Sequence, residues 1–281
     1  MSKEKETEID FLRSEVKRLR EALNELTPSL SAILKRRGFR IYKKEPSDDL
    51  LIPEKKFIDG YYEMLKRYSF RLFLRDVIKH QPLFTLQQVT RYATKEVTDE
   101  YISYLVKTRL AAPENNAHRL KKGPIKSFGE TLEWFVAEIF KREFASEAVW
   151  GVKMKRPGIG GDYDLLAKID GSILYMEIKS SPPKQVYQKE VSAFLDRVYD
   201  LMPEIAIFFM DTELRMKDKM VPMFEDELKL RFSEPPEVIR IERELFEIQT
   251  ERPKIFIINA KDSIINNIEK VLARYFRRSN G

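Results

Sequence analysis

The sequence predicts an α/β protein whose C-terminal half forms a mixed β-sheet flanked by helices. Strand-like and helical segments alternate along this half, which is typical of that class. The segment IAIFFM at 205–210 is apolar without alternation, as expected for a central strand covered on both faces. An Asp170-Gly171 pair lies between two alternating runs, and this pair is a strong signal for a tight β-hairpin.

The expected order over residues 126–281 is helix, three strands, helix, strand, helix, two strands and helix. Apolar periodicity sets the approximate bounds of each element. The expected helices cover 128–144, 186–202, 215–231 and 262–277, and the expected strands cover 148–154, 162–169, 172–179, 204–211, 245–249 and 254–259.

The N-terminal segment 1–28 predicts a short coiled-coil helix. Its apolar residues repeat with alternating steps of three and four, which is the heptad seam of a coiled coil. The seam is expected to join two chains into a homodimer, or to pack back on its own chain. Residues 29–65 contain prolines and many cations and are interpreted as a basic connector. The seam consists of Ile9, Leu12, Val16, Leu19, Leu23 and Leu26.

Residues 66–122 predict three short helices followed by a polar hairpin. Thr85 and Thr98 are expected to cap the second and third helices. The segment resembles a winged helix, with 98–110 as recognition helix and 111–122 as wing. The resemblance implies contacts to DNA phosphates or groove edges, although winged helices also serve as protein-protein modules. The basic residues expected to contact DNA are Lys107, Arg109, His118, Arg119, Lys121 and Lys122.

Composition restricts the chemistry that this chain supports. The 281 residues contain no cysteine, which excludes disulfides, thiolate zinc sites and cysteine nucleophiles. A metal must therefore bind oxygen, or the two histidines. The formal charge of +6 favours a polyanionic partner. No apolar run is long enough for a membrane span and the charged N-terminus does not resemble a secretory signal, so we expect a cytoplasmic protein.

The segment 160–181, GGDYDLLAKIDGSILYMEIKSS, carries the sharpest chemical signal. A two-residue turn at its centre fixes the register, so that Asp164 faces Glu177 and Asp162 faces Lys179. Because side chains alternate between the faces of a strand, these four residues are expected to share one face.

Two carboxylates facing each other across a strand pair need a compensating charge. At about 5 Å they repel by roughly 3 kcal/mol at an effective dielectric near 20. A cation between Asp164 and Glu177, protonation of one carboxylate, or neutralisation by Lys179 and Lys168 would resolve the conflict. A divalent ion suits a set of oxygen ligands.

A third carboxylate is expected on the helix at 128–144. Ser127 and Glu130 fit a capping box, which gives Glu130 a structural task at the helix start. Glu133 instead falls within the apolar face of this helix, where a carboxylate is costly unless it is paired or coordinated. Glu133 is therefore the preferred ligand, with Glu130 as the alternative.

Together, an acidic residue on a leading helix, an Asp before an apolar strand and a Glu-x-Lys ending the next strand resemble the PD-(D/E)XK nuclease superfamily. This superfamily includes restriction endonucleases and archaeal Holliday junction resolvases, and the resemblance covers residues 126–212. The first motif reads GGDYD, without the proline, so Asp162 remains an alternative to Asp164. Asp164 is preferred because it directly precedes the apolar LLA and faces Glu177.

The resemblance implies a restriction-endonuclease-like fold with a metal site. Glu133, Asp164 and Glu177 would bind one or two divalent cations, Mg²⁺ or Mn²⁺, and the carbonyl of Ile178 would complete the site. Lys179 would orient or help to deprotonate the attacking water and contact the phosphate.

The expected function is thus a metal-dependent DNA endonuclease in repair, recombination or defence. A winged-helix-like domain before the nuclease domain at 126–281 resembles restriction enzymes of the Mrr type. The alternatives are a non-catalytic DNA-binding or scaffold protein with a relic nuclease fold, and RNA as the substrate. Two further lysines, either solvated or in contact with DNA phosphates, are Lys184 and Lys189.

Overall fold

The structure, a computed structural model, describes residues 27–156 and 159–279, together with six single positions before Thr27. The heptad segment 1–28 therefore lies almost wholly outside the described residues, and the expected coiled coil and dimer stay predictions. No helix in the described part of the chain is both long and apolar enough to cross a bilayer.

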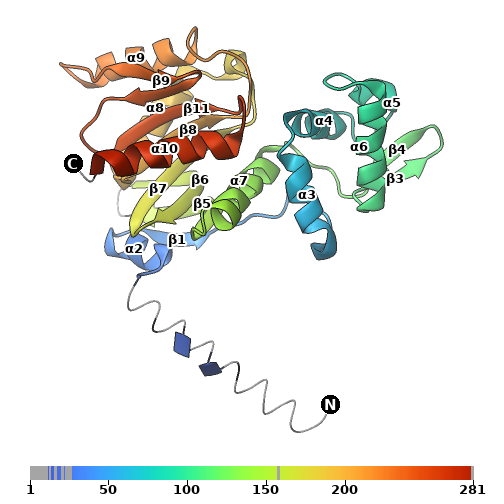
Figure 1. Ribbon diagram of the computed structural model, residues 1–281, viewed down its shortest axis with the longest axis horizontal. Helices are drawn as coiled ribbons and strands as arrows, with labels where there is room; N and C mark the ends of the chain where they lie inside the picture. Colours follow the sequence, from blue (N-terminus) through green and yellow to red (C-terminus); the bar gives the residue numbers. More distant parts are fainter. Residues whose placement is uncertain are drawn as a thin grey trace.

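A mixed sheet of eight strands forms the centre of the larger part of the described chain (Figure 1). The strand order is β1-β5-β6-β7-β8-β11-β10-β9. β7, β8 and β11 run parallel, whereas the outer neighbours pair antiparallel. The strands are β1 (Arg40–Lys43), β5 (Ala148–Arg156), β6 (Ile159–Ile169), β7 (Ser172–Lys179), β8 (Ile205–Met210), β9 (Val238–Glu242), β10 (Leu245–Ile248) and β11 (Lys254–Asn259).

Helices cover both faces of this sheet and bury a separate apolar core on each. On one face, α7 (Gly129–Glu143) and α10 (Ile264–Ser279) pack over the strands, in front of the sheet in Figure 1. On the other face lie α2 (Leu30–Arg36), α8 (Gln188–Leu201) and α9 (Met220–Arg231). The α/β class with a mixed, flanked sheet is therefore confirmed.

The expected strands of the C-terminal half are all present, with bounds within three residues of the prediction. Helix α9 begins at Met220 instead of Arg215. A proline fits only the first turn of a helix, because it lacks the N–H that later turns require. Pro222 meets that condition in the observed helix. Strand β9 was not expected, since it is a short, half-exposed edge strand.

The stretch 29–65, interpreted from the sequence as a connector, is structured. It forms α2, β1, the short helix η1 (Lys55–Phe57) and α3 (Ile58–Leu65). The apolar side chains of Leu30, Leu34 and Phe39 are buried in the core shared with α8. β1 pairs with β5 and extends the sheet by one strand. The prolines break this segment into short elements without preventing its burial.

Residues 68–120 form a small helical module with its own three-stranded sheet, on the right of Figure 1. The sheet has the order β2-β4-β3, and its strands are antiparallel. The elements are α4 (Tyr68–Lys79), β2 (Leu83–Phe84), α5 (Leu86–Val89), α6 (Lys95–Lys107), β3 (Ala111–Glu114) and β4 (Ala117–Leu120).

One of the two expected helix caps in this module is correct. Thr85 forms a capping box with Gln88 at the start of α5. Helix α6, however, begins one turn earlier than expected, with Thr94 as its N-cap. Thr98 lies inside the helix, and its hydroxyl donates to the carbonyl of Thr94 at 2.8 Å. A threonine hydroxyl can cap a helix or donate to the carbonyl four residues earlier inside a helix. The sequence therefore did not show which of Thr94 and Thr98 is the N-cap.

A buried ion pair connects the small module to the sheet. Arg71 of α4 and Asp211, the residue after β8, are both almost completely buried. The Arg71 Nη2 atom lies 2.8 Å from Asp211 Oδ1, and Arg75 also donates to this carboxylate. Asp211 N in turn donates to Lys179 O at 2.8 Å. The orientation of α4 is therefore coupled to the end of β7.

Candidate active site

The β6–β7 hairpin has the predicted register from Ile169 to Leu165, but the predicted pairs Asp164–Glu177 and Asp162–Lys179 are not part of the ladder, and Asp162 lies opposite Lys153 of β5. Its ladder pairs Ile169 with Ser172 and continues to Leu165 with Met176. Asp164 is the next residue along β6, and its Oδ2 accepts a hydrogen bond from Ile178 N at 2.7 Å. The carboxylate is thus held against the backbone of β7 where the ladder ends.

The sharing of one face by all four polar residues of the hairpin is not observed. Leu165 and Trp150 pack in one core, whereas Tyr163 and Val152 pack in the other, so the alternation reverses between these positions. The reversal passes through Gly151 on β5, which has a φ of +55°.

Asp162 lies beyond the reversal and belongs to the surface. Its carboxylate is exposed and pairs with Lys153 Nζ at 2.8 Å. No interaction between Asp162 and the other three acids was found among the described contacts, whereas Asp164 interacts with Glu133 and Glu177. This arrangement favours Asp164 over Asp162 as the candidate ligand.

Glu177 is buried and surrounded by partners from β7 and α8. Its Oε1 lies 2.8 Å from Lys179 Nζ, and its Oε2 lies 3.4 Å from Arg197 Nη1. The Tyr175 hydroxyl also bonds to Oε2. Lys179 has a second carboxylate, Glu190 Oε1, at 3.3 Å. The lysine expected at this site is therefore present, with its amine between two acids.

Arg197 was not predicted from the sequence, although a signal was present. It lies on α8 three residues after Phe194 and four before Leu201, both of which are buried. A guanidinium within the apolar stripe of a helix needs an acidic partner. Glu177 supplies that partner from the facing strand.

Glu133 reaches the site from α7, on the opposite side of the sheet from α8. Burial, together with the negative charges of Asp164, Glu130 and Glu177, raises the pKa of Glu133 to about 9. Burial and the charge of Glu177 raise the pKa of Asp164 to about 7, although the Ile178 N–H bond opposes this. Negative charges nearby therefore hinder the ionisation of both Glu133 and Asp164.

The expected capping box at the start of α7 is absent. The helix begins at Gly129, and Ser127 Oγ accepts from Gly129 N at 3.2 Å. Glu130 Oε2 instead accepts from Asp49 N at 2.9 Å, so it fixes the preceding segment. Glu130 still has a structural task, which keeps Glu133 as the preferred third acid.

The donor set suits a hard divalent cation. Carboxylate oxygens are the ligands that Mg²⁺ and Mn²⁺ prefer, and a cation would offset the repulsion that raises the pKa values of Glu133 and Asp164. Among the described residues, no three acidic or histidine side chains already converge as a ligand set. Both oxygens of Glu177 have partners, so a cation must compete with Lys179 and Arg197.

The basic residues that were expected to contact DNA differ in their surroundings. Arg109 pairs with Glu54 at 3.1 Å, Arg119 pairs with Glu114, and Lys122 Nζ donates to the carbonyl of Leu50 at 2.7 Å. His118 is half-buried and lies against the Phe84 ring. Four lysines are exposed and have no ion pair among the described residues, namely Lys107, Lys121, Lys184 and Lys189.

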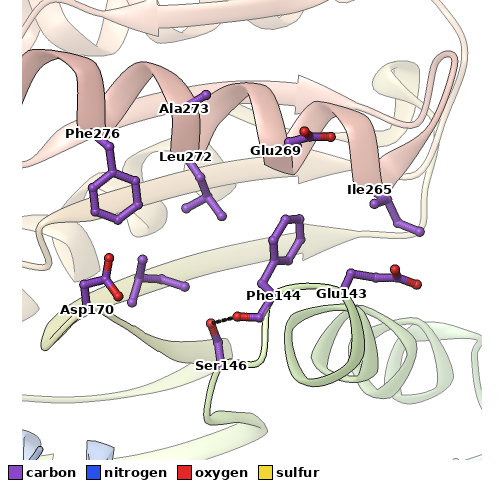
Figure 2. A pocket seen from close by; sticks show the side chains of 10 residues that line it. Glu143, Phe144, Ser146, Asp170, Ile265, Glu269, Leu272, Ala273 and Phe276 are labelled. Carbon is purple, nitrogen blue, oxygen red and sulfur yellow. Dashed lines mark hydrogen bonds between the residues drawn. The ribbon is translucent and has the colours of Figure 1, made fainter.

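A groove at the C-terminal end of α7, away from Glu133, is unsuited to binding phosphate. It has a volume of about 560 Å³ and lies between α10 and the residues that follow α7. Figure 2 shows apolar side chains of both elements facing each other there, with acids at the rim. The groove contains none of the candidate site residues. The acids are Glu143, Asp170 and Glu269.

No protein-family model matches this sequence, and no curated protein matches it either. Among solved structures, the crystal structure of protein VC1899 from Vibrio cholerae is similar, with a TM-score of 0.46 and 15% identity over 72% of this chain and 56% of that chain.

The structure of Can2 from Sulfobacillus thermosulfidooxidans, in complex with cyclic tetra-adenylate, is also similar. The TM-score is 0.40 and the identity 15%, over 64% of this chain and 50% of that chain. This chain thus matches about half the length of each structure. The likeness concerns the fold and assigns no activity to this protein.

Proposed function

We propose that this protein is a divalent-metal-dependent endonuclease that hydrolyses phosphodiester bonds in DNA. The observation that carries the proposal is the electrostatic interaction of Glu133, Asp164 and Glu177 beside the Lys179 amine. Placing the half-buried Glu133 and Asp164 beside the buried Glu177 is costly for stability alone. The same groups are those that hydrolysis with an oxygen-bound cation requires.

In this proposal the three carboxylates and the carbonyl of Ile178 hold Mg²⁺ or Mn²⁺. When bound, the cation offsets charge on the scissile phosphate and lowers the pKa of a water molecule. Tyr175 and Arg197 keep Glu177 oriented, since both interact with its Oε2. Fixing the orientation of a ligand in this way is typical of the residues that surround metal sites.

Lys179 has the role of orienting the attacking water and contacting the phosphate. Its amine lies 2.8 Å from Glu177 and 3.3 Å from Glu190, so it must release at least one carboxylate when substrate binds. The negative charge of Glu177 raises the pKa of Lys179, against the effect of burial. Lys179 is therefore protonated at neutral pH and acts as a hydrogen-bond donor and a positive charge.

We further propose that the small module is a winged helix that binds DNA, with β3 and β4 as its wing. Exposed acids occupy the start of α6 and would repel phosphates. Contacts are therefore expected from the end of α6 at Lys107 and from Lys121 after the wing, both of which are free of ion pairs among the described residues. The acids are Glu96, Asp99 and Glu100.

Incubation with linear, nicked, flapped and four-way DNA in the presence of Mg²⁺ or Mn²⁺ tests the activity. We expect one or more of these substrates to be cut, and EDTA to prevent it. Glu177→Ala should abolish cleavage, and Asp162→Ala should retain it, because Asp162 lies in a surface ion pair. The catalytic proposal fails if no substrate is cut above the level of Glu177→Ala. Matched DNA and RNA competitors distinguish the two substrate classes.

One observation favours a non-catalytic alternative. Lys179, Arg197 and Tyr175 already satisfy Glu177, as they would in a relic site that no longer binds metal. Such a protein would bind DNA without any dependence on divalent ions. Calorimetry distinguishes the two: binding of Mn²⁺ that is lost in Asp164→Asn excludes the relic, whereas absence of binding to the wild type supports it.

A further inference from the structure

A cleft of about 860 Å³ lies between the small module and the sheet. Helix α4 and the residues after α5 form one wall. The loops that follow β7 and β8 form the other. A volume of this size accommodates a ligand as large as a nucleotide. Its lining includes Arg75, Asp76, Lys79, Arg91, Tyr92 and Ser180.

The cleft adjoins the end of β7, the strand that carries Glu177 and Lys179. Ser180 directly follows Lys179 on the chain, and Asp211, another lining residue, donates its N–H to the Lys179 carbonyl at 2.8 Å. A strand with a phosphate at Lys179 would therefore have a neighbouring nucleotide beside this cleft.

Two polar atoms in the α4 wall are buried and have no hydrogen-bond partner in the described structure. One is Oδ2 of Asp76, a residue that is only 7% exposed. The other is Nε of Arg75. Unpaired buried polar atoms cost free energy, and a ligand with complementary donors and acceptors would recover it. Both side chains line the cleft, so a rotation that exposes these atoms would offer an acceptor and a donor to a ligand.

The remaining lining residues suit the other parts of a nucleotide. Tyr92 is 44% exposed, and the Arg91 guanidinium lies 5.2 Å from the centre of its ring. Lys79 and Arg91 are exposed and have no ion pair among the described residues. An exposed aromatic ring stacks with a base, and the two cations attract phosphate. The charge of Asp211 is offset by Arg71 and Arg75.

We propose that this cleft binds one unpaired nucleotide of the DNA strand that enters the candidate active site. This inference rests on the proposed nuclease function. Tyr92 stacks with the base, Asp76 accepts a hydrogen bond from a base N–H, and Lys79 with Arg91 contacts phosphate. The base must be unpaired, because in a duplex its Watson–Crick edge is already occupied. The substrates implied are DNA strands with a single-stranded segment, such as flaps or ends.

Binding of labelled single-stranded DNA to the full chain in EDTA tests the site without requiring catalysis. Fluorescence anisotropy gives the dissociation constant for an adenine-containing octamer. Tyr92→Ala should weaken binding about tenfold, the lower part of the range for loss of one stacked base. Tyr42→Ala is the matched control, because Tyr42 is an exposed tyrosine on the distant strand β1. It should leave binding unchanged.

Asp76→Asn distinguishes recognition of the base from simple attraction of phosphate, because the two kinds of site predict opposite changes in the dissociation constant. A site that reads the base exchanges a charged acceptor for the weaker amide oxygen and binds several-fold more weakly. A site that only attracts phosphate loses a repulsive charge and binds more tightly. Tighter or unchanged binding in Asp76→Asn therefore overturns the proposal, as does unchanged binding in Tyr92→Ala.

Two further binding measurements identify which part of the DNA the cleft recognises. An octamer with one abasic residue should bind about as weakly to the wild type as the intact octamer binds to Tyr92→Ala. Free dAMP at the same concentration should not displace the labelled octamer. If dAMP competes as well as unlabelled octamer does, the cleft binds a free nucleotide and not a nucleotide within a strand, which would overturn the proposal. Failure of cleavage with intact, Tyr92-dependent binding would refute only the nuclease function. Metal-dependent cleavage with Tyr92-independent binding would refute only this site.

Discussion

Burial raises the pKa values of Glu133 and Asp164 at the junction of α7, β6 and β7, and the charge of Glu177 raises both further. Both groups take up protons more readily in the folded chain than in the unfolded chain. The free energy of unfolding without metal therefore falls as the pH rises from the ordinary carboxyl range towards the raised values. A cation reverses this cost, because it favours the ionised forms.

Replacing Glu133 by glutamine should remove this pH-dependent cost. In EDTA we expect Glu133→Gln to have a higher melting temperature than the wild type at pH 8, with a smaller difference at pH 5. Thermal unfolding followed by circular dichroism measures both. Glu138→Gln on the same helix is the control, because Glu138 forms surface ion pairs with Lys141 and Arg142 and should give no gain. Equal or lower stability of Glu133→Gln at pH 8 would contradict the account.

Lys179 should be essential for the chemical step. Lys179→Met keeps the length of the side chain and removes the amine that orients water and phosphate. We expect turnover to fall at least 100-fold, as is usual for loss of one charge-stabilising donor. Single-turnover cleavage under saturating protein measures this step. Lys189→Met, at the start of α8, should change turnover less than tenfold. Equal effects of both substitutions would remove Lys179 from the mechanism.

At the residue scale, the acids of the candidate site could be predicted where their distance along the chain from a recognisable turn determined their position. The Asp-Gly turn fixed the register, so Asp164 and Glu177 were predicted together. Asp162 was expected on the same face because strict alternation was assumed, and the reversal at Gly151 removes it. Arg197 was missed because its partner Glu177 lies on another element. A contact between two elements is difficult to predict from the apolar pattern of either element alone.

At the element scale, Gly151 is the position at which the side-chain alternation of β5 reverses. Its φ is +55°, and a Cβ atom there would lie 2.3 Å from Pro46 Cδ and 3.6 Å from Glu133 Oε2. Only glycine satisfies both the backbone conformation and the close approach. The reversal occurs where β6 leaves the ladder with β7 at Asp164, next to Glu133.

Gly151→Ala should destabilise the chain more than Gly171→Ala. Gly171 also has a positive φ, +82°, but a Cβ there would meet nothing within 4 Å. Gly171→Ala should thus cost only the backbone term, about 1–2 kcal/mol. The clash at Gly151 adds to that term, and activity should fall as well. Urea unfolding measures both variants, and equal costs would show that the contact with Pro46 is unimportant.

The elements that the sequence located correctly are those with a clear apolar pattern, either a continuous apolar run or regular alternation. IAIFFM and the hairpin strands are examples, because their burial depends on local pattern. Strand β1 was missed because its exposed, cation-rich sequence RIYK becomes a strand only by pairing with β5. Pairing with a distant strand is a tertiary effect that overrides local propensity.

At the scale of the whole molecule, the contact between Arg71 and Asp211 joins the small module to the sheet. Both side chains are buried, and Arg71 also donates to the carbonyl of Leu65 at 2.6 Å. Removing Arg71 leaves the buried Asp211 carboxylate with Arg75 as its remaining cationic partner. We therefore expect Arg71→Met to lower the unfolding free energy by less than the about 3–5 kcal/mol that follows when a buried charge loses its only partner. Denaturant titration measures the loss. Arg67→Met, at an exposed arginine before α4, should cost little.

The location of a bound Mn²⁺ ion by anomalous diffraction tests the central claim most directly. Crystals of the full chain soaked in Mn²⁺ should show a peak within coordination distance of both Asp164 and Glu177, with Lys179 displaced from Glu177. Crystals of Asp164→Asn treated in the same way should show no such peak. If the ion is absent from wild-type crystals and the Lys179–Glu177 pair is intact, the metal-dependent nuclease is contradicted.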